Sequence, residues 1–271
     1  MSEGAGVEVR RSIGTPTLRR LDPFLMLDHF SSDNPDDYLA GFPDHPHRGF
    51  VTLTYMLDGH MLHRDSMGNR RDLVSGGAQW MKAASGVIHS EMPQQSDGLM
   101  RGLQLWINLP AAQKITAPTY REITPAAIPT VELSGATARV LAGRVGDTQG
   151  PIDDPHAALL YFDITVPAGL TINLPIANAL DGFVYLFEGL ARVAEVDLPT
   201  HQLAALGAGD SIVFTAGPTR ARFLLVAGRP IGEPIVQYGP FIMNTRTEIE
   251  QAFADYRDNR LVRARADIVG D

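Results

Sequence analysis

Two short motifs of the same form constrain the fold of this 271-residue chain more than any other feature. His45-Pro46-His47 and His89-Ser90-Glu91 each carry two side chains of metal-binding type, with one residue between them. Side chains two positions apart point to one side of a β-strand, whereas on a helix they point to opposed sides. We therefore predict that both motifs lie on strands and meet across a barrel. There they would offer three imidazoles and one carboxylate to a single ion, a set that suits a divalent first-row transition metal.

A second interpretation of these motifs stays open. His45 and His47 could lie on a solvent-facing loop, with Glu91 as an exposed acid. If the metal site exists, His29 and His63 are candidates for orienting a ligand through a hydrogen bond.

The residues after the first motif favour the metal site. Positions 45, 47, 51, 53, 55 and 57 are all odd-numbered, so they would lie on one side of a single strand, and the later ones are apolar. In an uninterrupted strand, both imidazoles would face the side that Leu53 and Tyr55 bury. A bulge at Gly49 would break this register.

The composition narrows the function classes. The chain has no cysteine, so nitrogen and oxygen must hold any metal, and disulfides are excluded. Its formal net charge of -8 argues against general binding to nucleic acids or anionic membranes. No apolar run approaches the roughly 18 residues of a membrane span, and residues 1–11 lack the apolar segment of a signal peptide. We expect a cytoplasmic monomer that binds neither nucleic acid nor membrane directly.

The hydrophobic pattern predicts an all-β fold with one helix. Apolar and polar residues alternate over 51–57 and 103–109, and residues 159–166 form a further strand-like segment of this kind. Short apolar runs between scattered Gly and Pro residues are typical of a sandwich or barrel. A helix is predicted near the C-terminus, with Asn244 or Thr245 as its N-cap.

A faint internal repeat indicates two similar β-domains in tandem. Phe50–Gly59 resembles Asp181–Gly189 at an offset of about 130 residues, and Val74–Met81 resembles Leu206–Phe214 at an offset of 132. We predict a metal-binding domain over residues 1–118 and a second domain over residues 119–271.

The same offsets predict that only the first domain has the metal site. Transferred to the second domain, the four candidate ligands fall on residues that cannot bind a metal, namely Pro175, Ala177, Ala221 and Phe223. Either the second domain lost its site or it never had one.

Several longer motifs, dense between about residues 19 and 118, give the chain a resemblance to a known family. They are Leu21-Asp22-Pro23-Phe24, Leu27-Asp28-His29-Phe30, Gly41-Phe42-Pro43-Asp44-His45-Pro46-His47-Arg48-Gly49-Phe50, His63-Arg64-Asp65-Ser66-Met67-Gly68-Asn69, Gln79-Trp80-Met81, Gly86-Val87-Ile88-His89-Ser90-Glu91-Met92-Pro93 and Gly102-Leu103-Gln104-Leu105-Trp106. Together they resemble the pirin family. One departure is Val51-Thr52, where the family often has Glu-Thr; this is not a ligand position in the family.

The resemblance implies two tandem cupin jelly-roll barrels, the first of which holds one metal ion. The family's ligands carry over onto His45, His47, His89 and Glu91, the same four residues that the spacing selects. Fe(II) is the implied ion, with Mn, Co, Ni, Cu and Zn as alternatives.

The resemblance leaves more than one function open. Some family members cleave the flavonol quercetin with O2 as 2,3-dioxygenases, so the chain would be an oxidoreductase with a small aromatic substrate. Others bind a transcription factor or a metabolic enzyme, and the metal is then structural or redox-sensing. A further alternative is an isomerase or other small-molecule cupin.

For a dioxygenase, the ligand set and the barrel suggest distinct roles. Four protein ligands would saturate a tetrahedral zinc, whereas a six-coordinate metal keeps two positions open. Glu91 is the expected catalytic residue, as a general base that takes the proton of the flavonol hydroxyl. The barrel would supply an apolar mouth with aromatic side chains that stack on a flat ring.

Overall fold

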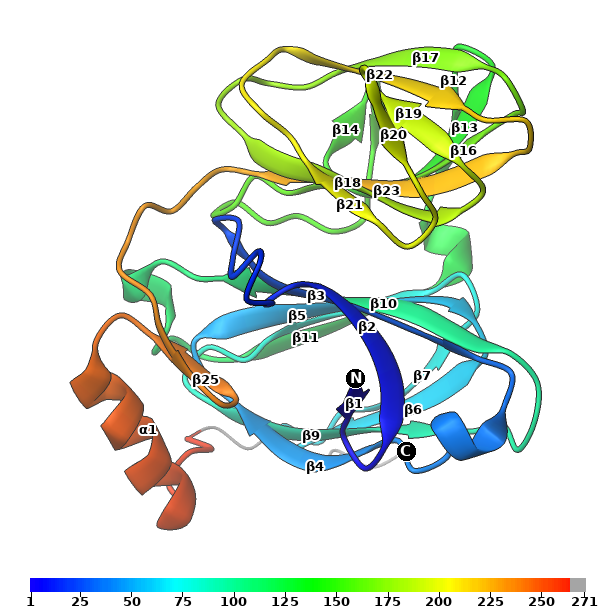
Figure 1. Ribbon diagram of the computed structural model, residues 1–271. Helices are drawn as coiled ribbons and strands as arrows, with labels where there is room; N and C mark the ends of the chain where they lie inside the picture. The colour runs from blue at the N-terminus through cyan, green and yellow to red at the C-terminus, as the bar shows by residue number, and fades with distance from the viewer. Residues whose placement is uncertain (264–271) are drawn as a thin grey trace. The chain divides into compact units, whose positions relative to one another are not determined.

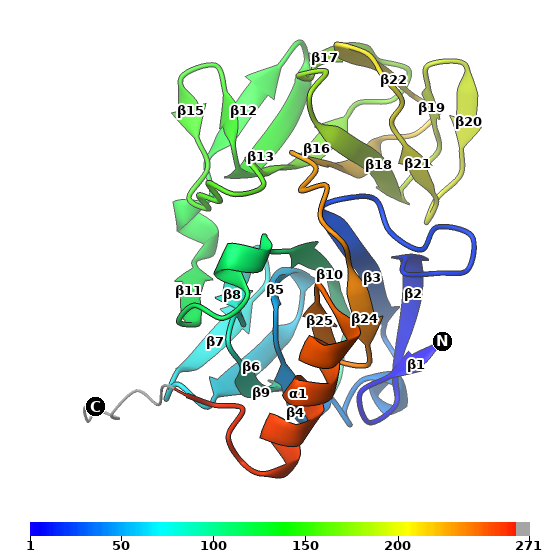
Figure 2. The same ribbon diagram turned by 90° about the vertical axis from the view of Figure 1, so that its left-hand side faces the viewer.

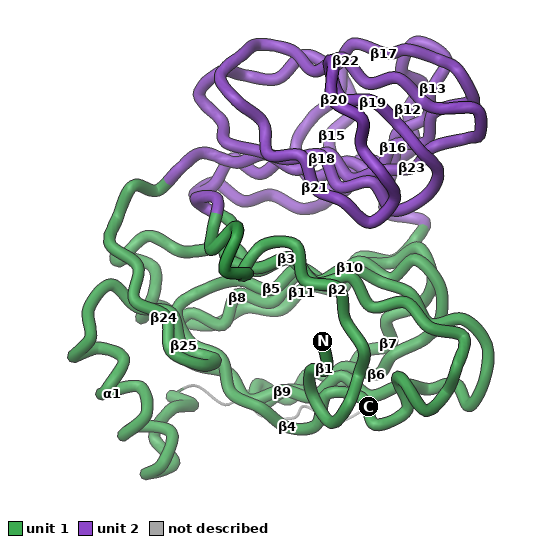
Figure 3. Tube along the Cα trace, viewed as in Figure 1, with its two compact units in different colours: residues 1–20, 24–125, 231–271 green, residues 21–23, 126–230 purple. Residues whose placement is uncertain are grey.

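The computed structural model describes residues 1–263, mostly as β-strands joined by turns (Figure 1). Contacts within the chain divide it into two compact units (Figure 3). Unit 1 comprises residues 1–20, residues 24–125 and the chain from Ile231 onward, and unit 2 comprises residues 21–23 and 126–230. The predicted division after residue 118 instead assigns the chain beyond Ile231 to the second domain. That residues 1–118 and 119–271 form separate domains therefore stays a prediction.

Unit 1 contains two larger sheets. The seven-stranded sheet has, in spatial order, β1 (Ser2–Glu3), β2 (Val7–Ile13), β3 (Phe24–Ser32), β10 (Met100–Asn108), β5 (Phe50–Asp58), β8 (Ala78–Lys82) and β11 (Thr119–Ile123). The four-stranded sheet has the order β4 (Phe42–His47), β9 (Val87–Pro93), β6 (His60–Asp65) and β7 (Arg70–Val74). Short 3₁₀ helices are Pro35–Asp37, Ala111–Gln113 and, at the boundary of the units, Pro125–Ala127.

Unit 2 is built from corresponding sheets. Its six-stranded sheet has the order β12 (Thr130–Leu133), β13 (Ala136–Ala142), β16 (Leu160–Val166), β23 (Ala221–Gly228), β18 (Asp181–Glu188) and β21 (Leu203–Ala205). Its four-stranded sheet has the order β17 (Thr171–Pro175), β22 (Ser211–Ala216), β19 (Ala191–Val193) and β20 (Val196–Leu198). A separate pair is formed by β14 (Arg144–Val145) and β15 (Thr148–Gln149).

The two units share one topology, which explains one of the two pairs of the internal repeat. The order β3-β10-β5-β8 in unit 1 corresponds to β16-β23-β18-β21 in unit 2, and β4-β9-β6-β7 corresponds to β17-β22-β19-β20. The first repeat pair is therefore structural, since it aligns β5 with β18. The second pair is not, because Leu206–Phe214 leads into β22, whereas the counterpart of β8 is β21.

This topology corrects the predicted counterparts of His89 and Glu91. Both residues lie on β9, whose counterpart is β22, whereas the predicted Ala221 and Phe223 lie on β23. Neither β17 nor β22 contains a histidine, aspartate or glutamate. Their alternate side chains are buried in an apolar cluster that includes Leu174 and Phe214. Unit 2 thus has hydrophobic packing on the strands that carry the histidine motifs in unit 1.

The C-terminal segment of unit 1 is a hairpin followed by a helix (Figure 2). The hairpin consists of β24 (Val236–Tyr238) and β25 (Phe241–Met243), and α1 spans Arg246–Arg257. Thr245 is the N-cap, as predicted, and forms a reciprocal capping box with Glu248. Buried Ile249 and Ala252 pack the helix against β25. No helix among residues 1–263 is long and apolar enough to cross a membrane.

The chain leaves the four-stranded sheet at Gly49, the glycine at which a break in the register was considered, so residues 45–57 do not form one uninterrupted strand. β4 ends at His47, and β5 begins in the other sheet. Gly49 has a φ of +91°, and a Cβ atom there would lie 1.8 Å from the carbonyl oxygen of Ile242. Only glycine fits such a turn. Beyond it, Thr54 rather than Leu53 faces the metal motifs, because its hydroxyl donates to Glu91.

Candidate metal centre

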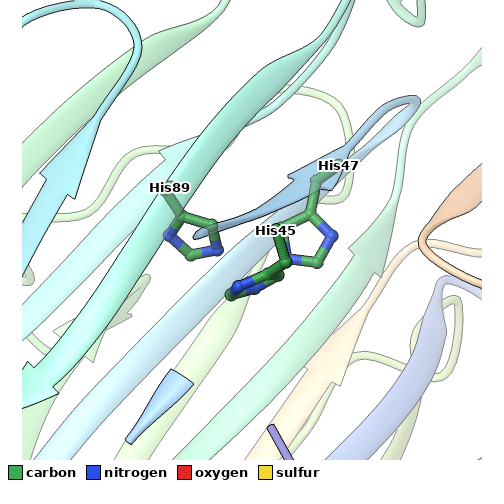
Figure 4. A group of neighbouring side chains, drawn as sticks. All are labelled: His45, His47 and His89. Carbon is green, nitrogen blue, oxygen red and sulfur yellow. The ribbon is translucent and has the colours of Figure 1, made fainter. Parts of the chain in front are cut away.

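Three imidazoles from two neighbouring strands converge in unit 1 (Figure 4). His45 on β4 pairs directly with His89 on β9, and His47 follows on β4. The ring centroids of His45 and His89 are 4.3 Å apart, and His47 lies 4.7 Å and 4.9 Å from them. One nitrogen from each ring lies within 4.8 Å of the others. The strand prediction for both motifs is correct, and three of the four candidate ligands are adjacent.

The protonation and burial of these rings fit a metal site. His47 and His89 are 2% and 1% exposed, and Nδ1 of His47 and Nε2 of His89 have no hydrogen-bond partner. Burial, reinforced by the neighbouring imidazoles, holds the pKa of both rings well below the ordinary histidine value. Both rings are therefore neutral near pH 7, which is the form that binds metals. Unpartnered buried nitrogens are costly, and a metal ion would satisfy them.

His45 has a fixed orientation at the edge of this group. Its Nδ1 lies 2.7 Å from the carbonyl oxygen of Pro43, which can only accept a hydrogen bond. The ring proton is therefore on Nδ1, and the Nε2 lone pair is available to a metal.

Glu91 lies on β9 beside His89 but outside the group of three imidazoles. Its Oε1 accepts hydrogen bonds from Thr54 (3.3 Å) and from the side-chain amide of Gln79, and its Oε2 accepts one from Gln104 (2.9 Å). The residue is 2% exposed. A carboxylate oxygen can accept two hydrogen bonds, so Oε2 retains a lone pair for a metal or a substrate proton.

The two histidines predicted to orient ligands lie in different places. His63 is beside His89, with 3.5 Å between their Nδ1 atoms, and it stacks on Tyr120 at 4.4 Å. His29 is on β3, where the adjacent Asp28 lines a cavity, so His29 lies on the opposite face of that strand.

A cavity of about 670 Å³ opens onto His45 and His47 within unit 1. Its aromatic lining comes from Trp106 and Phe42, whose roles the sequence left unassigned. The other lining residues come from the N-terminal segment, from β3, β4 and β10, and from the C-terminal hairpin: Glu3, Gly4, Ala5, Arg11, Met26, Asp28, Pro43, Asp44, Gln104, Gln237, Gly239 and Pro240.

The cavity wall is more polar than the apolar mouth that was predicted. Arg11 donates two hydrogen bonds of 2.7 Å to the carboxylate of Asp28 and forms an ion pair with Glu3 at 2.8 Å. Burial raises the pKa of the Asp28 carboxyl although Arg11 opposes the shift. This ion-pair cluster gives one side of the cavity fixed charges.

Comparison with known proteins extends the resemblance along the chain. Residues 6–107 match the Pirin family, and residues 161–262 match the Pirin C-terminal cupin domain. A Pseudomonas aeruginosa protein provisionally named a quercetin 2,3-dioxygenase is 49% identical over 268 residues, which cover 96% of this chain and 94% of that protein. Human pirin is 40% identical over 263 residues, covering 95% of this chain and 89% of its own length.

A solved structure of a similar protein has the same fold as this chain. The crystal structure of a quercetin 2,3-dioxygenase from Acinetobacter baumannii aligns with a TM-score of 0.89 at 31% identity, covering 96% of this chain and 94% of its own. The predicted all-β fold of two cupin barrels with a short C-terminal helix is confirmed. The chain belongs to the pirin family of two-cupin proteins.

Proposed function

We propose that this protein is an iron(II)-dependent dioxygenase that cleaves quercetin-type flavonols with O2. The observation that carries the proposal is the group of three imidazoles, two of them with unpartnered buried nitrogens, together with the cavity that His45, His47 and Trp106 line. The names of the Pseudomonas and Acinetobacter relatives support the same reaction.

In this proposal, His45, His47 and His89 hold the ion through their ring nitrogens, and Glu91 is the fourth ligand. When bound, the metal supplies a Lewis acid for the substrate oxygen and a centre for O2 chemistry. A set of three imidazoles and one carboxylate without thiolates suits iron, manganese, cobalt, nickel, copper and zinc. Iron(II) is the ion that we expect in freshly purified protein.

Glu91 also accepts the proton of the substrate. Its Oε2 is bound to Gln104, which lines both the large cavity and a void of about 20 Å³ beside Glu91. A flavonol hydroxyl that reaches the remaining lone pair of Oε2 would donate to it and be deprotonated there. The other two donors, Thr54 and Gln79, would keep the carboxylate in position.

The cavity has the size and the surface for a flat aromatic substrate. About 670 Å³ falls within the roughly 300–1,000 Å³ typical of small-molecule sites. The Trp106 ring meets the His47 ring edge-on, with 5.2 Å between the ring centroids, and its Nε1 donates to Gln104. Trp106 would therefore position an aromatic ring next to the metal ligands.

The test is the decay of quercetin absorbance in air after the metal-free protein is loaded with each metal in turn. His89→Ala and Glu91→Gln should both abolish turnover, and only His89→Ala should strongly reduce the metal content. His60→Ala is the matched control, because His60 is exposed and paired with Asp72. Full activity in either site variant would overturn the proposed roles.

The same assay separates catalysis from the alternative regulatory function. Stoichiometric metal binding without turnover for any metal would favour a protein whose metal senses the redox state. A pull-down of partner proteins with the oxidised and the reduced forms would then be the next measurement.

A further inference from the structure

Three buried polar side chains form a chain of contacts from β6 to β9. Nε2 of His63 lies 3.0 Å from Oδ2 of Asp65, and Nδ1 of His63 lies 3.5 Å from Nδ1 of His89. The side chains of His63 and Asp65 are 1% and 0% exposed. Strand pairing holds this geometry, because Asp65 lies directly opposite His89.

Asp65 can act only as a hydrogen-bond acceptor in this arrangement. Its Oδ1 accepts from the backbone N–H groups of Met67 (2.9 Å) and Asn69 (3.1 Å), and its Oδ2 accepts from the side-chain amide of Asn69 (2.9 Å). These three donors leave the carboxylate no proton of its own to donate, so its contact with Nε2 of His63 requires an N–H on that nitrogen.

The position of that proton determines the next contact. A His63 ring that carries its single proton on Nε2 has a lone pair on Nδ1. The facing Nδ1 of His89 must then donate, since two lone pairs cannot form a hydrogen bond. The remaining lone pair of His89 is on Nε2, the same buried atom that has no partner.

We propose that Asp65 and His63 are positioning residues that fix His89 in the tautomer able to bind a metal through Nε2. The proposal rests on the metal binding proposed above and adds two residues that touch neither metal nor substrate. Histidine ligands commonly donate their other N–H to a partner that sets the tautomer. Here the partner is a second imidazole, which is itself oriented by a carboxylate and by stacking on Tyr120.

The first variant is Asp65→Asn. The two backbone N–H groups keep the new amide oxygen in the place of Oδ1, so the amide nitrogen faces His63. Nε2 of His63 must then accept, its Nδ1 carries the proton, and His89 is driven to the tautomer with its proton on Nε2. We expect metal affinity to fall about 10–100-fold, as is usual when such supporting contacts are lost.

The second variant, His63→Phe, removes the relay and keeps a ring against Tyr120. It should weaken metal binding to a similar extent. In this background Asp65→Asn should have no further effect, because Asp65 acts through His63. A merely structural role of Asp65 in the turn over residues 65–69 would instead give additive losses.

Two readouts test the proposal in the full-length chain. The first is the Zn²⁺ dissociation constant, measured by competition with a chelator. The second is the tautomer of His89, read from ¹⁵N chemical shifts of the imidazole rings. The exposed pair His60–Asp72 on β6 and β7 provides the control Asp72→Asn, which should leave both readouts unchanged.

The outcomes distinguish this inference from the proposed function. Unchanged Zn²⁺ affinity and an unchanged His89 tautomer in both variants would overturn the relay. If a variant does not fold, the wild-type protein still tests the relay, because the His89 tautomer can be measured without metal. A His89 proton on Nε2 in the metal-free wild type would overturn the relay. Absence of quercetin turnover, with the expected affinities and tautomer, would overturn only the dioxygenase.

Discussion

The guanidinium of Arg48 is bound to the carboxylate of Asp255, 207 positions later in the chain, at 2.8 Å. Their side chains are 2% and 7% exposed, and Arg48 also donates to the carbonyl oxygens of Ser85 and Leu261. Arg48 follows His47 directly, so this ion pair attaches α1 to the end of the strand that carries two candidate ligands.

The first prediction concerns the stability that this pair provides. Asp255→Ala should lower the free energy of unfolding by about 3 kcal/mol, because it leaves a buried guanidinium without its counter-ion. Glu250→Ala on the same helix removes an exposed pair with Arg246 and should cost less than about 1 kcal/mol. Urea unfolding followed by circular dichroism measures both. Equal losses in the two variants would contradict the assigned role of Arg48–Asp255.

A pH dependence follows from the same carboxylate. Burial acts to raise the pKa of Asp255, but the hydrogen bonds from Arg48 and Gln251 outweigh it and lower that pKa below its ordinary value. The unfolded chain therefore takes up this proton first as the pH falls. The stabilisation is complete above about pH 4 and is lost as the pH falls through the lower folded pKa.

Asp255→Asn removes the titrating group and should reduce the loss of stability below about pH 4. Unfolding midpoints in urea, compared between pH 7 and pH 3 for the wild type and the variant, measure this difference. An identical acid-induced loss in both proteins would show that Asp255 does not contribute to it.

Local sequence patterns predicted the elements that carry the site. The ligand-x-ligand spacing identified β4 and β9, alternation identified β5 and β10, and Thr245 marked the start of α1. These features depend on neighbours within a few residues, so a single sequence contains them. The alternation of side chains does not continue past Gly49, because the chain changes sheets there. A side chain at this position would collide with the carbonyl oxygen of Ile242, a residue far away in the sequence.

Local sequence patterns did not predict which residues surround the candidate ligands. Gln79 and Gln104 bind Glu91 from two different strands, and nothing in the spacing of the two glutamines marks them as partners. Only a fold that brings β8 and β10 to face β9 reveals their role. The family resemblance included both glutamines but gave them no function.

The third prediction tests the support of Glu91. Gln104→Leu removes the donor to Oε2 and the acceptor for Trp106. We expect kcat/KM for quercetin to fall about 10–100-fold, because a misplaced catalytic group loses its alignment with the substrate. The metal content should stay unchanged, since the three imidazoles are intact. Gln94→Leu, at an exposed position, is the control for replacing a glutamine by leucine.

The fourth prediction concerns the effect of metal on stability. An ion that binds only the folded state at 100 times its Kd adds about 2.7 kcal/mol to the free energy of unfolding. Loading the metal-free protein with iron(II) under anaerobic conditions should therefore raise the unfolding midpoint, and removal by a chelator should reverse the shift. His47→Ala removes a ligand and should abolish the shift, whereas His60→Ala, outside the group of imidazoles, should retain it. A midpoint that rises equally in wild type and His47→Ala would place the stabilising metal elsewhere on the protein, and the candidate centre would lose its assignment.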